Sequence, residues 1–239
     1  MKRPEMIFFD YGQTLISEDG FDGVRGTYEV LKHAVGNPHG YTAEEVQKEA
    51  DAILSDLGWG DWQTRHTHIA EIHEYNFNAY LYESLGIKLG ITPGETERIF
   101  WDAAAPGRPT EGIGRFLDLL HESGIRTAVI SNISFSGKAL TDRINSLIPG
   151  NHFEFIIASS EYIFRKPHRR IFNLALEKAR LSSDEVWYVG DNLICDIEGA
   201  KKAGIMPVRY TGASGKNNEE IPGVISVSSW DELATLITL

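Results

Sequence analysis

Hydrophobic residues gather in five short runs along the chain, separated by longer amphipathic stretches. The runs are mostly continuous rather than alternating, and they fall at residues 6–9, 127–130, 155–158, 186–189 and 206–210. Continuous apolar runs of this length are typical of strands that are covered on both faces in a parallel sheet. Because the fifth run contains Pro207 and Arg209, we expect it to form an edge strand.

The stretches between these runs show helical spacing. One apolar face repeats from Ile113 to Leu120, and Gly124 is placed to end that helix. Pro167 is suited to the first turn of another helix, which would run through Leu176. Strands that alternate with helices predict an α/β fold with a doubly wound, Rossmann-like parallel sheet.

Residues 17–107 break this alternation. They contain no convincing strand, and a turn is expected at Pro93-Gly94. Helical patterns cover residues 28–35, 46–54 and 69–82. A segment of this length is not a loop inside a compact domain. We therefore expect residues 17–107 to form a helical domain inserted into a core made of residues 1–16 and 108–239.

Charge and cysteine content narrow the class of protein. The 239 residues carry a net charge of -11, which argues against a surface for nucleic acid or anionic membranes. A metal or a few local cations can still create one anion site within a cleft. Cys195 is the only cysteine, so no intramolecular disulfide can form. No apolar stretch is long enough for a membrane span or a signal peptide, so we expect a cytoplasmic protein.

Polar residues with catalytic potential follow the ends of the predicted strands. Ligands of doubly wound sheets bind beyond the carboxyl ends of the strands, near the topological switch point. Carboxylates, hydroxyls and a lysine together supply a nucleophile, ligands for a hard cation and donors for phosphate oxygens. The candidate residues are Asp10, Thr14, Ser131, Asn132, Lys166, Asp191 and Asp196. An isolated aspartate at a strand end is usually only a polar terminus, so the prediction depends on the whole set.

Four separated motifs in this order resemble those of the haloacid dehalogenase-like (HAD) hydrolase superfamily. The motifs are the segments at Asp10, Ser131, Lys166 and Asp191. The resemblance covers residues 6–16 and 108–228, and the helical insert stands where that superfamily places its cap domain. It implies a phosphatase-type HAD hydrolase with a Rossmann-like core and an α-helical cap.

The resemblance also implies how phosphate would be bound. Asp10 would be the nucleophile that forms an aspartyl-phosphate. Ser131, with Thr14 and Asn132, would bind the phosphoryl oxygens. Lys166 would neutralise charge on the nucleophile and the intermediate. An alternative is that Lys166 belongs to a solvated basic face with the neighbouring arginines.

A Mg²⁺ cofactor is implied in the same way. Asp10, the backbone carbonyl of Gly12 and Asp191 would be its ligands. Asp196 would position the water shell of the metal or hold Lys166.

One position departs from the superfamily pattern. Its phosphatases usually carry a second aspartate two residues after the nucleophile, as general acid and base, and here that place is Gly12. Positioned acid–base catalysis is typically worth ~10²–10⁴-fold. A histidine of the insert is one candidate to replace it, among His66, His68 and His73. On a continuous helix these three would not face one metal ion.

The leading hypothesis is a Mg²⁺-dependent hydrolase that cleaves phosphate from a small phosphorylated metabolite. A phosphonatase-like hydrolase is an alternative, and it would need a lysine of the insert, where Lys32, Lys48 and Lys88 occur. A 2-haloacid dehalogenase is less favoured, because that branch lacks an aspartate at the position of Asp191. A binding or regulatory protein on a disabled hydrolase fold is the alternative from another class, and Gly12 supports it.

Overall fold

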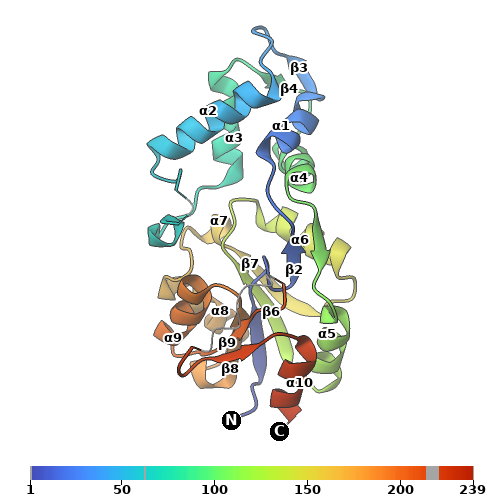
Figure 1. Ribbon diagram of the computed structural model, residues 1–239, viewed down its shortest axis with the longest axis vertical. Helices are drawn as coiled ribbons and strands as arrows, with labels where there is room; N and C mark the ends of the chain where they lie inside the picture. Colours follow the sequence, from blue (N-terminus) through green and yellow to red (C-terminus); the bar gives the residue numbers. More distant parts are fainter. Residues whose placement is uncertain (1, 62, 214–220, 239) are drawn as a thin grey trace.

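A six-stranded sheet with helices on both faces forms one end of the molecule (Figure 1). The computed structural model describes residues 2–61, 63–213 and 221–238. The strand order is β10-β9-β8-β1-β6-β7, and every neighbouring pair is parallel. The strands are β1 (Met6–Phe9), β6 (Arg126–Ser131), β7 (Phe153–Ala158), β8 (Val186–Gly190), β9 (Met206–Tyr210) and β10 (Ile225–Val227). The prediction of a doubly wound parallel α/β sheet is confirmed.

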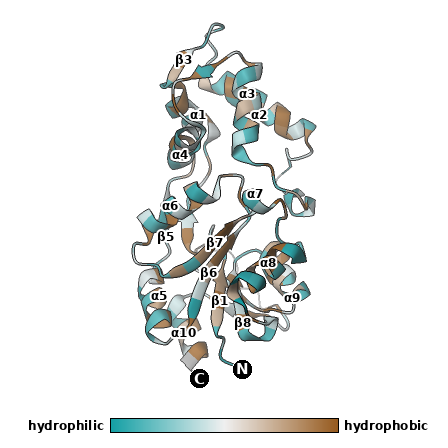
Figure 2. Ribbon diagram, turned by 180° about the vertical axis from the view of Figure 1, so that it is seen from behind, coloured by the Kyte–Doolittle hydropathy of each residue, from teal (hydrophilic) through white to brown (hydrophobic). Residues whose placement is uncertain are grey.

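Side chains of the central strand alternate between two hydrophobic clusters, one on each face of the sheet. Ile7 and Phe9 belong to one cluster, and Met6 and Phe8 to the other, and all four are fully buried. This explains why the strand reads as a continuous apolar run. The first cluster is covered by α5 (Ile113–Glu122), α6 (Gly137–Leu147) and α10 (Trp230–Thr238). The second is covered by α8 (Arg169–Ala179) and α9 (Gly199–Lys202), and Figure 2 shows the apolar strands between the layers.

Residues 23–104 form a helical unit beyond one end of the sheet (Figure 1). Its helices are α1 (Gly23–Leu31), α2 (Ala43–Asp56), α3 (Glu74–Ser84) and α4 (Pro93–Ala104), with a 3₁₀ turn at Arg65–Thr67. It has its own hydrophobic cluster, which includes Val30, Val46 and Leu81. An antiparallel ribbon of β2 (Ile16–Glu18) and β5 (Gly107–Pro109) joins it to the sheet. These features agree with an inserted domain of residues 17–107, and its limits stay a prediction.

Several predicted elements are wrong in type or extent. β9 is not an edge strand, because β10 pairs with it. Residues 17–107 do contain strands: the ends of β2 and β5, and the pair β3 (Ala34–Gly36) and β4 (Lys88–Leu89). Strands of two or three residues are too short to show a period in the sequence.

The predicted helices differ mainly at their ends. α1 ends at Leu31, and the helix expected from Pro167 begins at Arg169. The helix expected over residues 69–82 begins only at Glu74, because the preceding segment is extended and pairs with residues 163–165. The turn expected at Pro93-Gly94 is instead the first turn of α4, which begins with a capping box between Thr92 and Glu95.

The remaining described elements are short: α7 (Ser159–Tyr162), a 3₁₀ turn at Ser183–Glu185 and a π-helical segment at Leu193–Glu198. Within the described ranges, no helix is both long enough and apolar enough to cross a membrane.

Candidate active site

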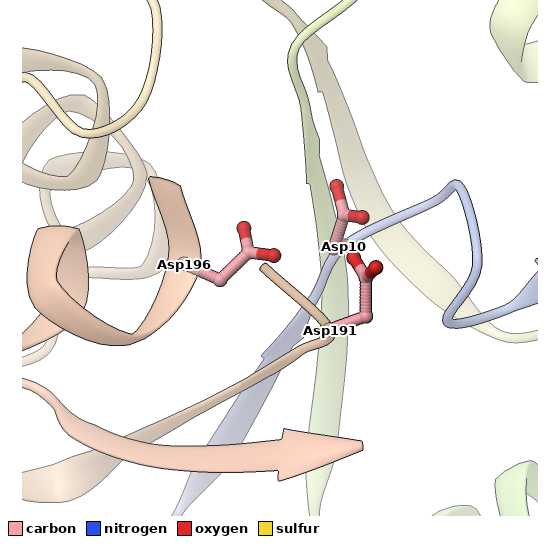
Figure 3. Close-up of side chains that lie close together, drawn as sticks. All are labelled: Asp10, Asp191 and Asp196. Carbon is pink, nitrogen blue, oxygen red and sulfur yellow. The ribbon is translucent and has the colours of Figure 1, made fainter. Parts of the chain in front are cut away.

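Three aspartates meet beyond the carboxyl ends of two adjacent strands. Asp10 follows β1, Asp191 follows β8, and Asp196 comes from the π-helical segment. Carboxylate oxygens of the three lie within 4.8 Å of one another, and Figure 3 shows the groups converging. β1 lies between β6 and β8, where the chain passes to opposite sides of the sheet, so this is the switch point of the fold.

Lys166 connects two of these carboxylates. Its Nζ donates hydrogen bonds to Asp10 Oδ1 at 2.5 Å, to Asp196 Oδ1 at 2.7 Å and to the Tyr188 hydroxyl at 2.7 Å. The lysine side chain is 2% exposed, so the alternative of a solvated basic face is wrong. Burial by itself lowers the pKa of Lys166, but the charges of Asp10 and Asp196 raise it above its ordinary value. The lysine is therefore a fixed cation beside Asp10.

The backbone and side chain of Lys166 are held by neighbouring polar groups. The Asn132 amide donates to the Lys166 carbonyl at 2.8 Å and accepts from the Lys166 N–H at 2.7 Å. The Tyr188 hydroxyl lies 3.1 Å from Asp196 Oδ1 and 3.2 Å from the Ile130 carbonyl oxygen. Asp196 Oδ2 accepts the backbone N–H of Asn192 at 2.9 Å. Asn132 thus positions Lys166, and the Tyr188 hydroxyl accepts one of the hydrogen bonds that its Nζ donates.

The three carboxylates have too little positive charge around them. Burial raises the pKa of Asp10, against the opposing charge of Lys166. Burial also raises the pKa of Asp191, and the charges of Asp196 and Asp10 raise it further. One lysine therefore does not offset three clustered acids. A set of carboxylate oxygens with this unmet negative charge suits a hard divalent cation, so the residues fit Mg²⁺.

A cavity of about 570 Å³ opens over this cluster. The predicted site residues that line it are Asp10, Gly12, Ser131, Asn132, Lys166, Asp191 and Asp196. Thr14 is fully buried and is not among them, so its predicted contact with phosphate gains no support. Its hydroxyl has no hydrogen-bond partner among the described atoms, and its carbonyl accepts from Thr110 at 2.9 Å. A larger cavity, of about 670 Å³, lies between α4 and α6 and contains none of the three aspartates.

Gly12 has room for a side chain. A Cβ built at this position would meet no atom within 4 Å, and its backbone is outside the left-handed region. The next residue, Gln13, has a φ of 53° and donates its amide to the Glu18 carbonyl oxygen at 2.8 Å. The glycine is therefore not required by the turn itself.

Of the three histidines considered, only His66 lines the cavity. The three histidines do not share one continuous helix. His66 lies in a 3₁₀ turn, the Nε2 of His68 lies 2.9 Å from the Gly58 carbonyl oxygen, and His73 caps the N-terminus of α3. His66 is thus the histidine placed to act near substrate.

Glu18 also lines the cavity, although the sequence did not predict it there. It lies on β2, in the ribbon that leads to the helical insert. Burial raises the pKa of Glu18, and the nearby Arg143, 3.6 Å away, opposes that rise. A carboxyl group with a raised pKa keeps a proton to a higher pH, so Glu18 is a second candidate acid.

Comparisons with known proteins bear on the family and the fold of the chain. A family model described as "Haloacid dehalogenase-like hydrolase" matches residues 102–209. The pyrimidine 5'-nucleotidase YjjG of Escherichia coli K12 is 28% identical over 235 residues, covering 98% of this chain and 97% of that protein.

Two solved structures share the fold over nearly the whole chain. The 2-haloacid dehalogenase of Pseudomonas syringae pv. tomato superposes with a TM-score of 0.65 at 16% identity, covering 98% of this chain and 97% of that one. A HAD phosphatase of Thermococcus onnurineus superposes with a TM-score of 0.63 at 17% identity, covering 97% of each chain. At such identities these structures bear on the fold and not on the reaction. The family match and the full-length relative confirm the expected resemblance to the haloacid dehalogenase-like hydrolases, and the two solved structures confirm the fold.

Proposed function

We propose that the protein is a Mg²⁺-dependent hydrolase that removes phosphate from a small phosphorylated metabolite through an aspartyl-phosphate at Asp10. The observation that carries this proposal is the buried lysine between Asp10 and Asp196, beside Asp191, whose pKa is raised by burial and by the charges of Asp196 and Asp10. The full-length E. coli relative is named for hydrolysing nucleoside 5'-phosphates, which supports a phosphate ester as the substrate class.

The chain's own residues account for both half-reactions. One Asp10 oxygen attacks phosphorus and the P–O bond to the leaving group breaks. The leaving-group oxygen takes its proton from solvent water or from a cavity acid, Glu18 or His66. Lys166 stabilises the carboxylate before attack and the acyl-phosphate charge after it, since its Nζ lies 2.5 Å from Asp10. Ser131, buried at the end of β6 and lining the cavity, would donate to a phosphoryl oxygen. Water then cleaves the aspartyl-phosphate, which releases phosphate and restores Asp10.

Asp10, the Gly12 carbonyl and Asp191 would hold the metal ion, and Asp196 holds Lys166 through their 2.7 Å contact. When bound, Mg²⁺ supplies charge neutralisation and orients the transferred phosphoryl group. Residues 17–107 would act as a cap, since Phe21, Arg65 and Trp101 from this part of the chain line the catalytic cavity.

The alternatives receive less support. A phosphonatase-like enzyme needs a lysine from the insert, but Lys32, Lys48 and Lys88 are exposed and absent from the catalytic cavity. A metal-independent dehalogenase has no use for the carboxylate of Asp191 at this place. A disabled hydrolase is favoured by Gly12, but the nucleophile Asp10, the cation Lys166 and the carboxylate of Asp191 are all present at the site.

Phosphate release from a panel of phosphomonoesters tests the proposal, with Mg²⁺ and with excess EDTA. Wild-type protein should release phosphate only with Mg²⁺, and Asp10→Asn should be inactive while folded. Asp118→Asn, a change at an exposed aspartate of α5, is the matched control and should keep full activity. Equal release in EDTA, or turnover by pure Asp10→Asn protein, would refute the proposal.

A further inference from the structure

A buried arginine lies behind the wall of the catalytic cavity. Arg143 is on α6 and is 9% exposed, and none of the steps proposed above uses it. It lines the cavity of about 670 Å³ between α4 and α6. Three residues that it contacts, Tyr11, Glu18 and Trp101, line the catalytic cavity. Arg143 is therefore placed to act on the catalytic cavity from outside it.

The guanidinium of Arg143 holds both segments that connect the helical insert to the sheet. Its Nη1 donates to Asp102 Oδ1 at 2.7 Å, and its Nη2 donates to the Ala105 carbonyl oxygen. Asp102 lies on α4 and Ala105 directly follows that helix. Glu18 Oε1, on β2 in the other connecting segment, lies 3.6 Å from Nη2. The two carboxylates supply counter-charges for the buried guanidinium, so Arg143 is fixed where the insert joins the core.

The remaining donor of Arg143 reaches the loop that carries the nucleophile. Its Nε donates to the Tyr11 hydroxyl at 2.8 Å. Tyr11 is buried and stands between Asp10 and Gly12, the two neighbours proposed above as metal ligands. The Tyr11 carbonyl oxygen accepts the backbone N–H groups of residues 15 and 16, both at 3.0 Å. Tyr11 is thus held at its hydroxyl and at its backbone, so a displaced hydroxyl would move the peptide groups on either side.

A lysine at position 143 could not make the same set of contacts. A guanidinium presents its N–H donors in a planar fork, and here the fork reaches Tyr11, Asp102 and Ala105 at once. Its central carbon also lies 4.5 Å from the centroid of the Trp101 ring. An ammonium group would replace the charge but not the simultaneous hydrogen bonds. The fork, and not the charge alone, therefore holds the Tyr11 hydroxyl.

We infer that Arg143 is a positioning residue, which fixes Asp10 and the Gly12 carbonyl relative to each other through the Tyr11 hydroxyl. Arg143 touches neither the metal nor the substrate. Changing a group that orients metal ligands typically costs about 10–100-fold in metal affinity or activity. This inference rests on the proposed function, because it takes from it the roles of Asp10 and Gly12.

Tyr11→Phe and Arg143→Lys test the inference, alone and combined. The phenylalanine keeps the buried ring and removes only the hydroxyl. Each single change should lower kcat for 4-nitrophenyl phosphate, whose leaving group needs no acid, and weaken Mg²⁺ binding in calorimetry, both by about tenfold. Because both changes break the same contact, the double variant should lose no more than Arg143→Lys alone.

Tyr80→Phe on α3 and Arg115→Lys on α5 are the matched controls. Both residues are exposed, so kcat and the Mg²⁺ affinity should stay at their wild-type values. A purely structural role of Arg143 gives a different result. Tyr11→Phe and Arg143→Lys would then lower the free energy of unfolding in urea, while the folded variants kept the wild-type kcat and Mg²⁺ affinity.

That result, or additive losses in the double variant, would overturn the inference. Tyr11→Phe gives the same two readouts even where the lysine variant does not fold. Weaker Mg²⁺ binding by Tyr11→Phe, with no phosphate release by wild-type protein, would support the role of Arg143 and refute the phosphatase proposal. Turnover by wild-type protein, with unchanged kcat and Mg²⁺ affinity in Tyr11→Phe, would overturn the role of Arg143 alone.

Discussion

Because Gly12 stands where related phosphatases carry an acid, we predict that the rate depends strongly on the pKa of the leaving group. An alkyl phosphate needs its departing oxygen protonated, whereas an aryl phosphate departs with little help. The wild-type rate should therefore fall steeply as the pKa of the leaving group rises. Gly12→Asp should restore activity on alkyl phosphates selectively.

The space around residue 12 limits the gain in activity that Gly12→Asp can give on alkyl phosphates. A well-positioned general acid is worth ~10²–10⁴-fold, or about 3–5 kcal/mol of activation free energy. The new side chain has space and no backbone strain, since nothing lies within 4 Å of a Cβ at residue 12. The same open space means that no packing would fix its carboxyl group. We therefore expect a gain at or below the low end of this range, about 10–100-fold on alkyl phosphates.

The assay is a series of phosphomonoesters with graded leaving-group pKa, measured as kcat/KM for wild type, Gly12→Asp and Gly12→Asn. The asparagine variant has nearly the same size without a transferable proton, so it should give no gain. Equal gains from both variants, or equal gains on aryl and alkyl esters, would contradict the reasoning. A flat series in wild type would show that another acid acts, and Glu18→Gln and His66→Gln would then identify which of the two cavity residues it is.

The remaining predictions concern the metal, the lysine and the insert. Asp191→Ala should abolish most Mg²⁺ binding in calorimetry, and unchanged affinity would contradict the assigned ligands. Lys166→Met should lower the free energy of unfolding in urea by about 3–5 kcal/mol, because Asp10 and Asp196 would lose their shared cation. A decrease below 1 kcal/mol would contradict the proposed stabilisation by this lysine. Burial raises the pKa of Glu74 from 4.5 to about 7, so its stabilising contribution is complete below pH 4.5 and is lost as pH rises through 7. Through this group, the free energy of unfolding should therefore be larger at pH 5 than at pH 8 by up to about 3 kcal/mol. Glu74→Gln should remove this difference.

The core of the fold was predictable because its central strand is buried on both faces. The run of Met6–Phe9 has one hydrophobic cluster above and one below, so nothing polar interrupts it. β10 was missed because Ile225–Val227 is only three residues long and contains a serine. The extended segment before Glu74 was mistaken for helix because its partners lie almost a hundred residues away, at 163–165. Only tertiary structure supplies those hydrogen bonds.

The site was predictable to the extent that strand ends determine it. Asp10 and Asp191 follow adjacent parallel strands, so their meeting follows from topology. Tyr188 was not predicted, because an apolar strand gives no sign that one hydroxyl reaches Lys166. Glu18 was not predicted either, since its place in the cavity depends on the ribbon of β2 and β5. A signal for Glu18 does exist, as it is a carboxylate just after the nucleophile motif.

The most direct test of the central claim is to trap the covalent intermediate. Wild-type protein with Mg²⁺ and a radiolabelled phosphomonoester, quenched in acid within one turnover, should carry label on the peptide that contains Asp10. Hydroxylamine should release that label, as it does from an acyl-phosphate, and Asp10→Asn protein should carry none. Label on another residue, or full turnover with no labelled protein at any quench time, would contradict the account.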